Sequence, residues 1–277
     1  MKIIVTKEWL LETISNEDLI ILDARADLSN PDGGLEQYNE GHINGAQFVS
    51  LEETMSGKIE AHGGRHPIPD MEKFIEDMKA LGMKDSSTVL IYDDGDLVMA
   101  GRLWWLLRYA GKSNVYILEG GTKSWKDSGL PLTKDIDNPK ESNSLSLNID
   151  GSMRVDMEDV KKSVDLDNVA LVDSRSYARY SGEVEPLDRI AGHIPNAVNF
   201  PWEDTLAKGK NLDKEVLKEH FKSLEKFEDI IVYCGSGVSA TVNLIFMEEI
   251  GLKPKLYPGS YSDWVSYPDN IVEVEEF

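Results

Sequence analysis

Residues 229–246 read DIIVYCGSGVSATVNLIF and contain the only cysteine of the chain, Cys234. A β-branched apolar run precedes the cysteine, a glycine-rich loop follows it, and a second apolar run continues to residue 246. The first run is typical of a buried strand, and the second fits a helix. The stretch therefore predicts a strand–loop–helix unit with the thiol at the carboxyl end of the strand.

The same order of motifs occurs twice in the chain. Four pairs of segments match: 20–25 (IILDAR) with 170–175 (ALVDSR), 41–48 (GHINGAQF) with 192–200 (GHIPNAVNF), 89–95 (VLIYDDG) with 230–237 (IIVYCGSG), and 118–125 (LEGGTKSW) with 257–264 (YPGSYSDW). Four matches in one order are not expected by chance, so we interpret the halves as duplicated domains. The predicted boundaries are 1–133 for the first domain, 134–152 for a polar linker and 153–277 for the second domain.

Within each half, short apolar runs alternate with helical patterns, several of which end in glycine. This alternation predicts an α/β fold in which each domain has a mostly parallel sheet flanked by helices. Ligands of such sheets bind beyond the carboxyl ends of the strands. Cys234 is therefore expected at the binding edge of its domain.

Composition excludes several classes of function. The net charge is -21, from 29 basic and 50 acidic residues, and such a surface repels the phosphate backbone of nucleic acids. No stretch approaches the ~20 apolar residues of a membrane span, and no signal segment is recognisable, so a cytoplasmic protein without a membrane partner is expected. One cysteine excludes an intramolecular disulfide and a cysteine-rich zinc site, and we predict neither a metal nor an organic cofactor.

The loop after the cysteine suits an anion. Its residues, Gly235, Ser236, Gly237, Val238 and Ser239, can curl so that backbone N–H groups point to the centre, and a helix begins near the last of them. These features favour a thiolate, and we expect an exposed, negatively charged sulfur. The alternative is a buried structural cysteine, because free cysteine is among the most buried residue types.

These motifs together give a specific resemblance. With DAR…GHINGA…YDDG…GGTKSW in its first half and DSR…GHIPNA…YCGSGVSA…PGSYSDW in its second, the chain resembles tandem-domain sulfurtransferases of the rhodanese family over nearly its whole length. The resemblance implies two rhodanese-like domains, of which the first is catalytically silent and the second carries the active cysteine. Asp93, which cannot carry sulfur, stands at the position that matches Cys234.

The activity implied is a two-step transfer of sulfur. Cys234 takes the outer sulfur of a small anionic donor as a persulfide and passes it to cyanide, a small thiol or a thioredoxin-like protein. Because the chain has no second cysteine, no internal thiol can release the sulfur, and an external acceptor is required.

The resemblance also bears on the donor. Relatives that use thiosulfate typically carry cationic residues after the cysteine, whereas those that use 3-mercaptopyruvate carry CGSGV, as this chain does. Arg179 stands where the latter place a substrate-binding arginine, and Arg189 corresponds loosely to a second; a guanidinium can grip a carboxylate with paired hydrogen bonds. Ser236 and His66 match a serine and a histidine that polarise the substrate, with His66 reaching an interdomain cleft from the first domain. Glu52 replaces the family's aspartate.

Two other functions remain open at this point. A group of phosphatases shares the fold and the cysteine loop, but those enzymes need an arginine six positions after the cysteine, where this chain has Ala240. A non-enzymatic sulfur carrier or scaffold is the second alternative, and the intact cysteine loop argues against an inactive scaffold.

Two pairs of repeated polar residues are expected to be structural. His42 and His193, both in GHI, are suited to hydrogen bonds with the backbone, and Asp23 and Asp173 end predicted strands, where they can hold neighbouring loops.

Overall fold

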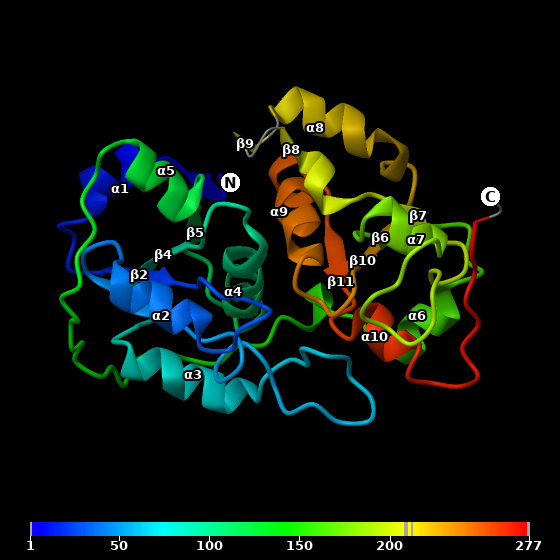
Figure 1. Ribbon diagram of the computed structural model, residues 1–277, viewed down its shortest axis with the longest axis horizontal. Helices are drawn as coiled ribbons and strands as arrows, with labels where there is room; N and C mark the ends of the chain where they lie inside the picture. Colours follow the sequence, from blue (N-terminus) through cyan, green and yellow to red (C-terminus); the bar gives the residue numbers. More distant parts are fainter. Residues whose placement is uncertain (1, 208–209, 212, 276–277) are drawn as a thin grey trace. The chain divides into compact units, whose positions relative to one another are not determined.

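The computed structural model describes residues 2–207, 210–211 and 213–275. The chain divides into two compact units: Met1–Gly57 with Ile68–Asp150, and Lys58–Pro67 with Gly151–Phe277. We call these unit 1 and unit 2. Most of their elements are labelled in Figure 1.

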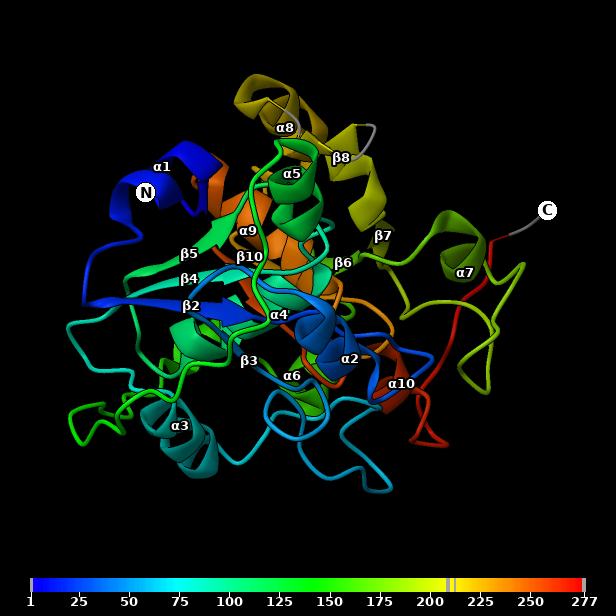
Figure 2. The same cartoon turned by 60° about the vertical axis from the view of Figure 1, so that its left-hand side comes forward.

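Unit 1 contains one parallel five-stranded sheet in the order β1-β5-β4-β2-β3. Figure 2 shows β5, β4 and β2 side by side. The strands, in sheet order, are Ile4–Val5, Val115–Leu118, Thr88–Tyr92, Leu19–Asp23 and Ala46–Phe48. The helices α1 to α5 are Lys7–Thr13, Gly33–Glu40, Met71–Ala80, Val98–Tyr109 and Gly121–Asp127.

The helix α4 packs on β4 and β5 and is buried along its whole length except at Arg108. Its sequence, VMAGRLWWLLRY, is apolar on almost every side, which is the pattern of a helix enclosed by the fold. Trp104 and Trp105 are fully buried in it.

Unit 2 contains a parallel four-stranded sheet in the order β11-β10-β6-β7. The strands, in that order, are Pro254–Leu256, Asp229–Tyr233, Val169–Asp173 and Val198–Asn199, and β8 (Leu206–Ala207) pairs antiparallel with β9 (Lys210–Asn211). The helices α6 to α10 are Met157–Ser163, Tyr177–Ser181, Lys214–Phe221, Ala240–Ile250 and Ser260–Trp264, and the 3₁₀ turns are Gly151–Met153, Trp202–Thr205 and Lys222–Leu224. Figure 1 shows α9 beside β10 and β11, on which it packs.

The predicted α/β class, with one parallel sheet flanked by helices in each half, is therefore confirmed. The unit boundaries differ from the domain boundaries predicted from the sequence at two places. Residues 58–67 group with unit 2, although they lie early in the chain. Residues 134–150, predicted as linker, group with unit 1, because their backbone bonds to it: Ser142 N–H donates to the Lys79 carbonyl, and Asn148 N–H to that of Ala110.

The repeated motifs build the same corner in each unit. In unit 2, the Asp173 carboxylate accepts hydrogen bonds from the Arg175 guanidinium at 2.6–3.0 Å, and Arg175 also donates to the Gly192 carbonyl. The Tyr233 hydroxyl accepts from the Ile194 N–H. The equivalent contacts of unit 1 involve Asp23, Arg25, Gly41, Tyr92 and Ile43. This buried corner explains why DAR/DSR, GHI and the strand-end tyrosine occur together in both halves.

The two histidines of the GHI motifs are structural, as expected. His42 Nδ1 lies 2.9 Å from the Tyr38 carbonyl, and His193 Nδ1 lies 2.8 Å from that of Tyr180. Each ring also stacks on the tyrosine it bonds to, with centroids 3.8 and 4.0 Å apart.

Candidate active site

Cys234 follows β10 directly, at the carboxyl end of a strand that is paired on both sides. Its backbone is held by the start of α10: the Cys234 N–H donates to Ser260 Oγ at 3.1 Å, and the Tyr261 N–H donates to the Cys234 carbonyl at 3.0 Å. Ser260 adopts a positive φ of 55°. The cysteine is thus fixed at the predicted binding edge of the sheet.

The loop curls back onto the sulfur. The Gly237 N–H lies 3.2 Å from Cys234 Sγ and donates to it. Gly237 has φ 76°, and a Cβ there would lie 2.1 Å from the Pro258 carbonyl oxygen, so only glycine fits. Val238 is buried, and Ser239 precedes the first residue of α9, whose positive end faces the loop. A backbone N–H and a helix terminus therefore meet at the thiol.

The expectation of an exposed sulfur is wrong, because Cys234 is only 1% exposed. The loop wraps the side chain, and two guanidinium groups lie against the next residue, Gly235. A Cβ on Gly235 would lie 2.9 Å from Arg65 Nη2 and 3.3 Å from Arg179 Nη1. The residue next to the thiol is therefore flanked by cationic groups, and a small anion is the kind of molecule that these groups attract.

The arginines are held by two buried acids. Arg179 Nη2 lies 2.8 Å from Glu185 Oε1 and 3.0 Å from Asp188 Oδ2, while Arg65 Nη1 pairs with Asp188 Oδ1. Glu185 Oε2 also pairs with Arg175 at 3.0 Å. Burial raises the pKa of Glu185, but hydrogen bonds from Arg179 and from backbone N–H groups outweigh it, and the net direction is downward. Glu185 is therefore a firmly ionised anchor.

The predicted pair of Ser236 and His66 is present. Ser236 Oγ lies 2.7 Å from His66 Nδ1. The histidine comes from the segment Lys58–Pro67, which is part of unit 2. The segment is tied to unit 2 by the Gly63 N–H, which donates to Asp263 at 2.7 Å, and by His62 Nδ1, which lies 2.7 Å from Ser266 Oγ.

Two other predicted residues are not part of this cluster as unit 2 forms it. Arg189 is exposed, and its guanidinium makes no ion pair with any residue that the structure describes. Glu52 is exposed and belongs to unit 1, so it is not part of the unit that holds Ser236 and His66. Their predicted roles stay predictions.

Sequence reasoning missed Arg65, Asp188 and Glu185. Arg65 directly precedes His66 in GRHPIP, so the segment that contains the predicted residue His66 also contains the missed residue Arg65. The two acids lie in EVEPLDR, between candidate arginines, and neither has a periodic pattern that marks it. Their roles depend on contacts among three separate segments.

Unit 1 has the equivalent loop with Asp93 in place of the cysteine. The Asp93 carboxylate accepts from the Gly95 N–H at 2.8 Å and from the Ala100 N–H at 3.0 Å. Burial, with the nearby Asp96 charge, raises the pKa of Asp93 to about 7. The loop of unit 1 thus holds a carboxyl group of its own, in line with the expectation that this half carries no sulfur.

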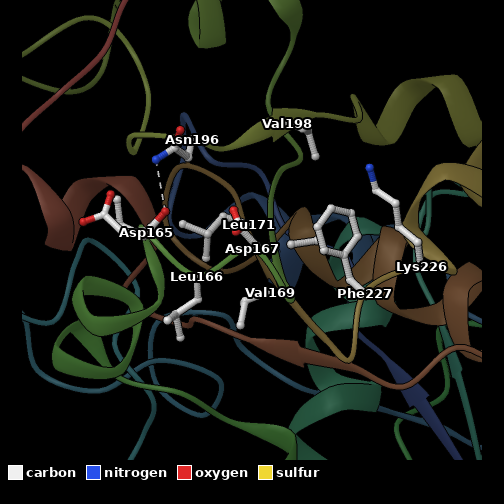
Figure 3. Close-up of a pocket in the computed structure, with 11 residues that line it drawn as sticks. Asp165, Leu166, Asp167, Val169, Leu171, Asn196, Val198, Lys226 and Phe227 are labelled. Atoms are coloured by element: carbon white, nitrogen blue, oxygen red, sulfur yellow. Dashed lines mark hydrogen bonds between the residues drawn. The ribbon is translucent and has the colours of Figure 1, made fainter.

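A separate cavity of about 500 Å³ lies at the amino end of β6, the opposite end from Cys234's edge of the sheet. Figure 3 shows it between Asp165, Leu166 and Asn196 on one side and Phe227 and Lys226 on the other. The Asn196 amide donates to the Val164 carbonyl at its rim. No candidate catalytic residue lines it.

Two features of the described residues bear on other functions. No cluster of histidine, cysteine and acidic side chains among them could hold a metal ion. None of the helices in the described part of the chain is long and apolar enough to cross a membrane. Ala240, where a phosphatase of this fold needs arginine, is the buried first residue of α9.

Comparison with known proteins agrees with this geometry. A protein of Pseudomonas aeruginosa named a probable 3-mercaptopyruvate sulfurtransferase is 37% identical over 272 residues, covering 96% of this chain and 95% of its own. SseB of Mycobacterium tuberculosis, provisionally named a thiosulfate sulfurtransferase, is 35% identical and covers 98% and 96%. The crystal structure of SseA from Escherichia coli, described among 3-mercaptopyruvate sulfurtransferases, superposes with a TM-score of 0.83 at 32% identity, over 95% of this chain and 100% of that one.

The two halves of the chain also match one domain family. Residues 6–128 and 156–267 both match the Rhodanese-like domain. The matched ranges contain all four repeated motif pairs and the loops of Asp93 and Cys234. The chain therefore belongs to the rhodanese family, with two rhodanese-like domains in tandem.

Proposed function

We propose that the chain is a sulfurtransferase that moves a sulfane sulfur from a small anionic donor, 3-mercaptopyruvate or thiosulfate, to cyanide or a thiol through a persulfide on Cys234. The observation that carries the proposal is the setting of the sulfur. Cys234 Sγ accepts from the Gly237 N–H at the carboxyl end of β10, and the guanidinium groups of Arg65 and Arg179 lie against the next residue, Gly235. A loop with this arrangement stabilises both a thiolate and an anionic persulfide.

The first half-reaction forms one bond and breaks another. The Cys234 thiolate attacks the outer sulfur of the donor, and an S–S bond forms. With 3-mercaptopyruvate the C–S bond breaks, its electron pair goes to the carbon, and that carbon takes a proton to give pyruvate. With thiosulfate the S–S bond of the donor breaks, and sulfite leaves with the electron pair. No external oxidant or reductant is needed in either case.

The second half-reaction returns the thiolate. Cyanide attacks the outer sulfur of the persulfide and leaves as thiocyanate, or a thiolate acceptor leaves as its own persulfide. Because the chain has no other cysteine, the acceptor must be a separate molecule. A small thiol and a thioredoxin-like protein both satisfy this requirement, and a reducing cytoplasm, which we propose as the location, keeps the thiol available.

The pair of Ser236 and His66 is assigned to proton transfer. Ser236 stands two positions after Cys234, and its hydroxyl oxygen lies 2.7 Å from His66 Nδ1. A hydroxyl that is hydrogen-bonded to an imidazole can move a proton to the carbon or the carbonyl oxygen of a keto acid. Thiosulfate needs no such proton. This difference and the neutral residues Gly235 and Ser236 lead us to favour 3-mercaptopyruvate as the donor.

Substitution of the nucleophile tests the function. Cys234→Ser is expected to abolish sulfur transfer to cyanide with either donor while the thermal unfolding midpoint stays near that of the wild type. Incubation of the wild type with donor alone is expected to add the mass of one sulfur atom at Cys234, as measured by mass spectrometry of the intact chain and its peptides. Turnover that persists in Cys234→Ser would disprove the proposal.

The preferred donor is tested by kcat/KM for 3-mercaptopyruvate and for thiosulfate under the same conditions. A higher value for 3-mercaptopyruvate is expected. A clear preference for thiosulfate would leave the sulfurtransferase in place and overturn the assignment of the donor.

A further inference from the structure

Gly235, the residue after Cys234, lies against the side chains of two arginines, Arg65 and Arg179. A Cβ on Gly235 would meet Arg65 Nη2 at 2.9 Å and the two terminal nitrogens of Arg179 at 3.3 and 3.4 Å. The two guanidinium groups therefore converge on one backbone position from different segments. Arg65 comes from Lys58–Pro67, and Arg179 comes from α7.

One carboxylate bridges these arginines. Asp188 Oδ1 pairs with Arg65 Nη1, and Asp188 Oδ2 lies 3.0 Å from Arg179 Nη2. The Asp188 side chain is 3% exposed, whereas those of Arg65 and Arg179 are 32% and 18% exposed. A single carboxylate that divides its oxygens between two guanidinium groups is the arrangement that a bound keto acid would adopt at the same place.

The two acids of this cluster are held differently. Glu185 accepts from Arg175, from Arg179 and from the backbone N–H groups of Leu187 and Asp188. The hydrogen bonds found for the Asp188 carboxylate within the described residues come from the two arginines. Burial raises the pKa of Asp188, although the Arg65 charge opposes the shift, so the ionised form of this acid is less favoured than in water. Asp188 is thus the acid that can be exchanged.

The ion pairs permit such an exchange. Arg175 is paired with Asp173 and Glu185, and Arg179 is paired with Glu185 as well as with Asp188. If Asp188 turns away, these other pairs remain, and the carboxylate of a donor can take the two places that Asp188 leaves on Arg65 and Arg179. The two planar guanidinium groups also suit a carboxylate better than a single ammonium would.

We propose that Arg65 and Arg179 together form the anion site for the sulfur donor, and that Asp188 occupies this site as an internal placeholder until the donor carboxylate displaces it. The inference rests on the proposed function for the identity of the donor, but the anion site itself can be tested without turnover. Arg65 is then a specificity-determining residue, and Asp188 is a positioning residue that holds both arginines in register between turnovers.

The test is a binding experiment in the Cys234→Ser background, with pyruvate, the desulfurated analogue of 3-mercaptopyruvate, as the probe. Isothermal titration calorimetry gives its Kd. Arg65→Gln is expected to raise the Kd by about tenfold, the value of one lost charge-assisted hydrogen bond. Arg154→Gln, at an arginine elsewhere in unit 2, is the matched control and is expected to leave the Kd unchanged.

Asp188→Asn is expected to lower the Kd for pyruvate by about threefold or more, because the competing carboxylate is gone. Glu183→Gln, at an exposed acid in the same segment, is the control. An unchanged or higher Kd in Asp188→Asn overturns the placeholder, and an unchanged or lower Kd in Arg65→Gln overturns the role of Arg65. If Asp188→Asn does not fold, as judged by its unfolding midpoint, Asp188→Ser is read in the same way.

Kinetics with the active cysteine separate this inference from the proposed function. Arg65→Gln is expected to raise KM for 3-mercaptopyruvate about tenfold and to change kcat little, since the arginine binds the donor and does not react. If the wild type forms no persulfide with any donor, the function fails while the pyruvate data still decide the anion site. If the wild type is active and Arg65→Gln has the same KM as Arg154→Gln, the proposed anion site is contradicted, whereas the proposed sulfurtransferase function is not.

Discussion

At the scale of single residues, the backbone conformation of Gly237 determines which group donates a hydrogen bond to Cys234 Sγ. Its positive φ and its approach to the Pro258 carbonyl turn the chain so that its N–H meets Cys234 Sγ. Gly237→Ala is expected to lower the free energy of unfolding by about 2 kcal/mol or more and to reduce persulfide formation. Gly251, with φ 100° and open space where a Cβ would lie, is the matched control, because Gly251→Ala has the backbone strain without the clash.

Urea unfolding and mass spectrometry after donor treatment measure these two effects. Equal stability of Gly237→Ala and Gly251→Ala would show that contact with Pro258 is unimportant. The sequence predicted the glycine-rich loop and its thiol, because a strand, two glycines and a helix are local signals. It could not predict the two guanidinium groups beside Gly235, since Arg65 and Arg179 come from segments that are remote along the chain.

At the scale of elements, the loop between β4 and α4 carries a buried acid where the loop between β10 and α9 carries the thiol. The pKa of Asp93 is raised from 3.8 to about 7, mainly by burial and then by Asp96. The folded state therefore binds more protons than the unfolded state between about pH 4 and pH 7, so the stability that this group contributes is full at low pH and is lost as pH rises through about 7.

Asp93→Asn is expected to remove this component of the pH dependence. The measurement is amide hydrogen exchange of peptides covering residues 88–109, at pH 5 and pH 8 after correction for the intrinsic exchange rate. The wild type should lose more protection than Asp93→Asn does, and Asp18→Asn, at an exposed acid of unit 1, should behave as the wild type. Identical losses in all three proteins would contradict a raised pKa at Asp93.

Elements of regular structure were largely predictable because their signals are local. The strands β2, β4, β6 and β10 are continuous apolar runs, and α4 and α9 follow their loops directly. The segment Lys58–Pro67 gave no such signal, since it contains neither helix nor strand and is held by contacts with residues 262–267. Its place in unit 2 is set by partners about two hundred positions away.

At the scale of the whole molecule, the first half of the sequence supplies part of the site in unit 2. Gly64 lies close to residues 259–262: it has φ 82°, and a Cβ on it would lie 2.4 Å from the Gly259 carbonyl oxygen and 2.8 Å from Ser262 Oγ. Gly64→Ala is therefore expected to displace Lys58–Pro67 from the rest of unit 2. Arg65 and His66 would move with it, because they are the next two residues.

The displacement has two measurable consequences. Sulfur transfer to cyanide should fall by about tenfold or more in Gly64→Ala, as expected when a residue that binds the donor is lost. Alkylation of Cys234 by iodoacetamide should become faster, because Arg65 no longer covers Gly235. Gly63→Ala is the matched control: Gly63 has φ 98°, but the nearest atoms to its Cβ are 3.9 Å away on Pro67. Equal alkylation rates in the two variants would mean that this segment does not cover the thiol.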